Sequence, residues 1–158
     1  MPRGADFRVE GAVQLAALST QLREAGNKTL MKSLRKRLNA VTKPIVAEVR
    51  AAAKATPGKG DGSLRASLAR SVQSKLSTSS KSASVSIKLS GARMPSGQRG
   101  LPALVEGLRP WRHPTFGHDP WKKQAPHPFF YQTLKKNEQK VQSEVARVLD
   151  DVTNEITK

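Results

Sequence analysis

The clearest helical pattern in this chain is LMKSLRKRLNAVTKPIVAEV, residues 30–49. Its apolar residues recur every three or four positions, the spacing that places them on one buried face of an α-helix. They are Leu30, Leu34, Leu38, Val41, Ile45 and Val49. Pro44 lacks a backbone N–H but lies inside the pattern, and the spacing continues beyond it. We therefore expect one long helix with a kink at Pro44.

The opposite face of this helix is basic. Glu48 is the single acid between Lys28 and Lys54, whereas a solvated helix face usually mixes both signs of charge. Two roles stay open for this face, simple solvation and contact with a polyanion or an acidic protein. The candidate basic face consists of Lys28, Lys32, Arg35, Lys36, Lys43 and Arg50.

Other elements follow outward from this helix. Leu15, Leu18 and Leu22 predict a preceding helix, and residues 7–9 are suited to a short strand. Apolar and polar residues alternate over residues 83–89, which predicts a strand that pairs with residues 71–76 in a hairpin. A last helix is expected from Pro128 onward. Its apolar stripe is Leu134, Val141, Val145, Val148, Val152 and Ile156, joined by Phe130.

These elements predict an α+β fold in which N-terminal helices and a long C-terminal helix pack on a small antiparallel sheet, with long loops. The length of 158 residues fits a single domain. We divide it into a helical part (1–55), a hairpin (62–90), a loop and aromatic segment (91–127) and a C-terminal helix (128–158).

Composition limits the function. The chain has no cysteine, which excludes disulfides and thiolate metal sites. It has no apolar run long enough for a membrane span and no secretory signal, so an intracellular, membrane-free protein is expected. Its net charge is +16, yet the residues after Asn137 hold three basic and five acidic side chains, a net charge of −2. This asymmetry favours a nearby polyanion or basic surfaces that meet acidic ones on neighbouring subunits.

The aromatic residues are concentrated in LPALVEGLRPWRHPTFGHDPWKKQAPHPFFYQTL, residues 101–134. Because proline fixes φ and donates no backbone hydrogen bond, we expect this segment to be irregular. Trp111 and Trp121 lie among basic residues, as interface anchors often do, although core packing is the alternative for every ring here. The candidate subunit-interface residues are Trp111, Phe116, Trp121, Phe129 and Glu106.

Signs of catalysis are weak. His113, His118, His127 and Asp119 raise the hypothesis of a metal-dependent nuclease, but Glu106 is the only other acid close in sequence, and two-metal nucleases need several carboxylates. The segment GKGDGS (58–63) lacks the lysine and hydroxyl pair of a phosphate loop, and no G-x-S-x-G motif occurs. We expect no enzyme, no metal and no cofactor.

Four short motifs occur in a telling order: ATP at 55–57, GSLRASL at 62–68, LVEG at 104–107 and PHPFF at 126–130. This order resembles that of the head–tail joining proteins (neck or tail-completion proteins) of long-tailed double-stranded-DNA bacteriophages. The resemblance covers the chain from about Val9 to its end. Two features differ from the family: Leu108 stands where the family commonly has threonine, and the loop that follows is longer.

The resemblance implies a non-catalytic virion protein, assembled in the host cytoplasm, that forms a ring in the phage neck. Its partners would be further copies of itself and the neighbouring connector, head-closure, tail-terminator or tail-tube proteins, with double-stranded DNA close by. A ring contact joins two different patches of one subunit, and we expect the basic helix to meet an acidic face made of Asp150, Asp151 and Glu155. The alternative is a small basic nucleic-acid-binding protein, whose affinity would fall steeply with salt.

Overall fold

The computed structural model describes residues 6–8, 11–58, 62–79, 83–115 and 118–158. Its elements are, in order, β1 (Asp6–Arg8), α1 (Ala12–Glu24), α2 (Lys28–Lys54), α3 (Ser63–Ser71), β2 (Val72–Ser77), β3 (Ser84–Leu89), the 3₁₀ turn η1 (Gly91–Arg93), α4 (Leu101–Val105), β4 (Trp111–Thr115), β5 (His118–Gln124) and α5 (Phe130–Ile156). The predicted α+β class is confirmed, including the long C-terminal helix.

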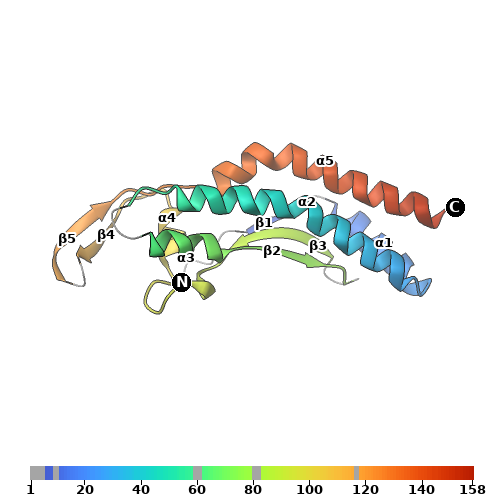
Figure 1. The fold of residues 1–158 in the computed structure, drawn as a ribbon, viewed down its shortest axis with the longest axis horizontal. Coiled ribbons are helices and arrows are strands. Elements are labelled where there is room, and N and C mark those ends of the chain that lie inside the picture. Colours follow the sequence, from blue (N-terminus) through green and yellow to red (C-terminus); the bar gives the residue numbers. More distant parts are fainter. Residues whose placement is uncertain (1–5, 9–10, 59–61, 80–82, 116–117) are drawn as a thin grey trace.

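Helix α2 lies in the middle of the molecule, with α5 on one side and the three-stranded sheet on the other (Figure 1). The two long helices run antiparallel, because Arg37 near the start of α2 bonds Glu155 near the end of α5, while Glu48 bonds Asn137. The predicted stripe of α2 is buried, with Leu34, Leu38 and Val49 wholly enclosed. The helix continues through Pro44, as the unbroken spacing predicted.

The sheet has the order β1-β3-β2, and both pairings are antiparallel. The predicted hairpin and the short N-terminal strand are therefore confirmed. Val85, Ile87 and Leu89 of the central strand are buried toward the helices, and the polar residues between them lie on the opposite face. Helix α3, nine residues long, leads directly into β2 of the hairpin.

Helix α5 begins at Phe130, two residues later than predicted, and buries its expected stripe. Phe130 is fully enclosed, whereas Ile156 in the last turn is 36% exposed. None of the described helices, including the two long ones, is apolar enough over sufficient length to cross a bilayer.

The prediction of an irregular segment at 91–127 is wrong. The segment forms η1, α4 and an antiparallel pair of strands, β4 and β5, which project from one end of the body (Figure 1). Both strands of a two-stranded sheet are edge strands. A proline is tolerated there at positions where the backbone N–H would face solvent and not the neighbouring strand. The register shifts between Pro114 and Thr115, where this pairing is irregular. We call residues 111–124 the arm.

Candidate functional site

The arm presents an exposed aromatic and basic surface. The side chain of Trp121 is 52% exposed, and Arg112, Lys122 and Lys123 are exposed around it. In the register of the arm, Arg112 lies opposite Lys123, and Pro114 lies opposite Trp121. Side chains two positions apart along a strand point to the same side. Arg112, Lys123 and Trp121 therefore share one face of the arm. Among the described elements the two strands pack chiefly on each other, and Arg112, Trp121 and Lys123 stay exposed.

The root of the arm, by contrast, is fastened to the body. One carboxylate oxygen of Glu106 accepts hydrogen bonds from the backbone N–H groups of Phe129 and Phe130, both at 2.7 Å, and the other accepts from that of Tyr131 at 3.4 Å. The N–H of His127 donates to the carbonyl of Val105 at 2.9 Å. Residues just before the arm are therefore bonded to residues just after it.

Glu106 caps α5 from a distance. The residue at the N-cap position, Phe129, has no side chain that can accept a hydrogen bond, and the first turn of α5 contains no acid. A carboxylate here satisfies orphan N–H groups and complements the positive end of the helix dipole. The structure thus assigns Glu106 a role within one chain, and its role at a subunit interface stays a prediction.

The predicted aromatic anchors fall into different environments. Phe129 is only 3% exposed and belongs to the core, so its prediction as an interface anchor is wrong for the chain as folded. Trp111 is half-buried and packs against the core at the root of the arm. Phe116 lies outside the described residues. Trp121 is the anchor that the structure leaves open to a partner.

A groove of about 410 Å³ lies between α2 and α5. Its apolar lining is Ala40, Val41, Pro44, Ile45, Val141 and Val148, and its charged lining is Arg37, Lys140, Glu144, Arg147 and Asp151. Three of these charges are paired within the chain: Arg37 with Glu155 at 2.7 Å, and Arg147 with Glu144 at 3.4 Å. The groove therefore combines an apolar floor with a rim of both signs.

The pairing of the basic helix with the acidic C-terminal helix of another copy stays a prediction. These two helices pack against each other within one chain, and Glu155 is already bonded to Arg37. Asp150 and Asp151 are exposed, and Asp151 lies on the rim of the groove. Asp151 thus belongs to the groove surface, whereas Asp150 lines a separate cavity between α1 and α5.

The basic face of α2 is only partly a solvated surface. Arg50 donates to the carbonyl oxygen of Val72 at 2.9 Å, and Arg35 donates to the hydroxyl of Thr78 at 2.6 Å. From Arg35 to Arg50 the helix rises about 22 Å, and from Val72 to Thr78 the strand extends about 20 Å. The spacing of the two arginines therefore matches the length of β2. They fasten the edge strand to the helix. The other four residues of the face, Lys28, Lys32, Lys36 and Lys43, are exposed.

No group of three histidine, aspartate or glutamate residues in the described part of the chain lies close enough to hold a metal ion. His113 is half-buried in β4, and His127 lies at the root of the arm, where its backbone bonds Val105.

Comparison of the chain with protein-family models, with curated proteins and with solved structures found no match in any of the three. Its function is therefore inferred from the surfaces described above.

Proposed function

We propose that this protein is a structural subunit of a bacteriophage neck, a head–tail connector that forms a ring between the DNA-filled capsid and the tail. The observation that carries the proposal is the arm, which holds an exposed tryptophan and a basic face away from a core that is already closed. Trp and Arg are enriched at interface hot spots. The order of short motifs in the sequence supports the same class, and no catalytic role is proposed.

The arm of one copy docks in the groove between α2 and α5 of the next. About half of Trp121 is exposed, on the order of 100 Å² of ring surface, and enclosing it on the apolar floor contributes about 2–3 kcal/mol. Glu144 and Asp151 on the rim give carboxylates to Arg112 and Lys123, which share the face of Trp121. Arm and groove are different patches of one chain, so the contact is heterologous and can close into a ring.

A gene deletion tests the proposed role. Particles assembled without this protein should accumulate as separate DNA-filled heads and separate tails under negative-stain electron microscopy. The wild-type gene supplied in trans should restore joined particles, and the Trp121→Ser gene should restore far fewer. Complete particles in the absence of the protein would overturn the proposal.

Introduced cysteines test the docking contact directly, because the chain has none of its own. Mixed Lys123→Cys and Asp151→Cys copies should form an intermolecular disulfide under mild oxidation, since a disulfide requires Cα atoms within about 7 Å. In the control, Lys54→Cys at the C-terminal end of α2 replaces Lys123→Cys. Equal cross-linking in both mixtures would show that the arm does not select the groove.

A second candidate function is nucleic-acid binding, which one specific observation favours. Residues 27–100 contain 16 lysines and arginines against two acids, Glu48 and Asp61. Within the described residues this excess lies on α2, α3 and the β2–β3 hairpin, apart from the arm. A steep fall of DNA affinity with rising salt is the expected signature. Absence of DNA binding at low salt would remove this candidate.

A further inference from the structure

A basic concavity lies where α1 turns into α2 and β2 ends. It has a volume of about 730 Å³, and its lining is Arg23, Arg35, Asn39, Leu76, Ser77, Thr78 and Ser79. A second cavity of about 470 Å³ shares both arginines and adds Lys28 and Lys32. Four cations from two helices therefore border one continuous surface.

Thr78 holds the two arginines in place. The guanidinium of Arg23 donates to the backbone carbonyl of Thr78, and that of Arg35 donates to the Thr78 hydroxyl through Nε at 2.9 Å and Nη2 at 2.6 Å. Thr78 itself is only 5% exposed, so its position is fixed by packing. Each guanidinium has five N–H donors, and the bonds to Thr78 use few of them. The remaining donors of two oriented guanidinium groups line the concavity.

The charges of this site are not balanced by a neighbouring acid. Neither cavity has a carboxylate among its described lining residues, and Glu24, which follows Arg23 in α1, lines neither. Two like charges fastened to one residue repel each other. An anion between them would relieve this repulsion and accept forked hydrogen bonds from both.

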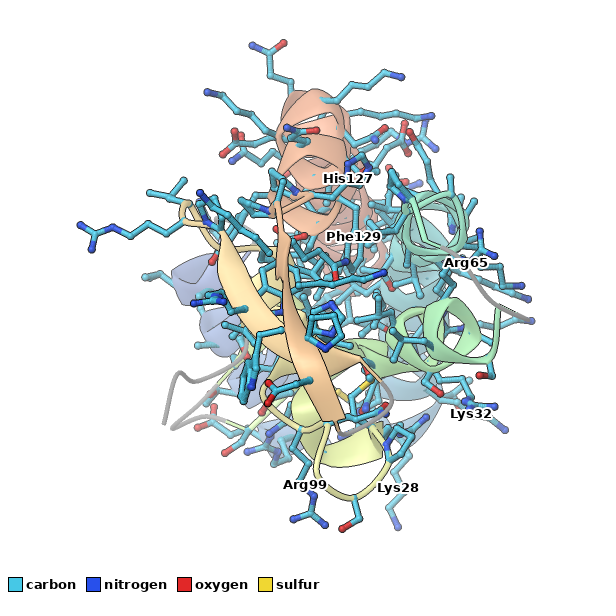
Figure 2. All side chains as sticks on the ribbon, turned by 90° about the vertical axis from the view of Figure 1, so that its left-hand side faces the viewer. Lys28, Lys32, Arg65, Arg99, His127 and Phe129 are labelled. Atoms are coloured by element: carbon cyan, nitrogen blue, oxygen red, sulfur yellow. The ribbon has the colours of Figure 1, made fainter. Side chains whose placement is uncertain are left out.

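The geometry points to this concavity as a binding site for the phosphate groups of a nucleic-acid backbone. A single carboxylate could bind the same two arginines, but further lysines form a row along α2 next to them. Lys28, Lys32 and Lys36 follow at intervals of four residues, which is about 6 Å along the helix. Figure 2 shows Lys28 and Lys32 at the lower and lower-right edge of the molecule. A row of cations suits a repeating anion better than a single one.

The site should recognise the backbone and not the bases. No aromatic ring lines either cavity among the described residues, so the surface provides no platform on which a base could stack. Contacts to phosphate fix position without reading sequence. This inference rests on the second candidate function and is independent of ring formation.

The test measures binding of a fluorescent 20-base-pair duplex by anisotropy over a series of salt concentrations. The Arg23→Gln/Arg35→Gln variant should lose at least tenfold in affinity near 100 mM salt, and its slope of log K against log salt should fall by about 2. Arg109→Gln/Arg112→Gln removes the same charge near and on the arm and should lose less than threefold.

Further variants keep the test decisive if the arginine pair is needed for folding. Lys28→Gln/Lys32→Gln changes exposed residues and should lower the slope by about 2 as well. Thr78→Val keeps both arginines but removes the hydroxyl that orients Arg35, so its affinity should fall several-fold with little change in slope.

The outcomes separate the site from the function. No duplex binding by the wild type at 50 mM salt defeats the second candidate function and this site with it. Binding that falls equally in the Arg23/Arg35 and Arg109/Arg112 variants defeats the site alone. Tighter binding of poly-glutamate than of the duplex would show that the concavity takes an acidic protein instead.

Discussion

Replacing Glu106 should loosen the start of α5 and the root of the arm together. Glu106→Ala removes the acceptor of two 2.7 Å hydrogen bonds and a third at 3.4 Å, in a helix with no other cap. Loss of a cap costs about 1 kcal/mol, and loss of a charge at a helix N-terminus costs about 0.5–1 kcal/mol. Two of the bonds are as short as charge-assisted hydrogen bonds, which are stronger than neutral ones. We therefore expect Glu106→Ala to lower the free energy of unfolding by about 2–3 kcal/mol in total.

Thermal unfolding followed by circular dichroism measures this loss. In a domain of this size 1 kcal/mol corresponds to about 2–4 °C in Tm, so Glu106→Ala should lower Tm by roughly 5–10 °C. Glu106→Gln keeps an acceptor without the charge and should lose about 1 kcal/mol. Glu138→Ala, in the same helix but with no such contacts, is the control and should change stability by less than about 0.5 kcal/mol. A Glu106→Ala protein as stable as this control would refute the assignment of the cap.

Three further substitutions test separate features. Gly91→Ala should destabilise by about 1–3 kcal/mol in urea unfolding, because a Cβ there would overlap the backbone carbonyl oxygen of Arg99, whereas Gly100→Ala meets open space and should be close to neutral. Arg37→Ala breaks a pair whose two side chains are 37% and 39% exposed, so it should cost less than about 1 kcal/mol; a larger loss would mean that α2 and α5 depend on it. Trp121→Ser should leave Tm nearly unchanged while it reduces ring formation seen by light scattering, and Tyr131→Ser, exposed to a similar degree, should reduce neither.

The helices and the hairpin were predictable from the sequence because each carries its own period. The apolar steps along residues 30–49 and the alternation at 83–89 are local signals, and the structure buries those residues. The arm was missed because Pro114 and Pro120 oppose a central strand, and the sequence gives no sign that both strands are edges.

The contacts that define the candidate sites could not be predicted from the sequence, for a different reason. Glu106 bonds backbone groups 23 to 25 residues away, and Arg35 bonds a threonine 43 residues away. Periodicity places a side chain on a face of its helix but does not identify the carbonyl or N–H group that it meets there. The basic face therefore looked uniform, although Arg35 and Arg50 bond the strand and the lysines do not.

Hydrogen bonds join residues 105–106 to residues 127–131, so the hairpin between them could be replaced by another one. Since both of its ends are anchored before the chain departs from the body, lengthening or shortening it costs little, as loop-closure entropy grows slowly with length. Relatives with longer or shorter hairpins would keep the same scaffold and acquire different binding specificity. Grafting a foreign hairpin between Gly107 and Ala125 should then redirect assembly without unfolding the host.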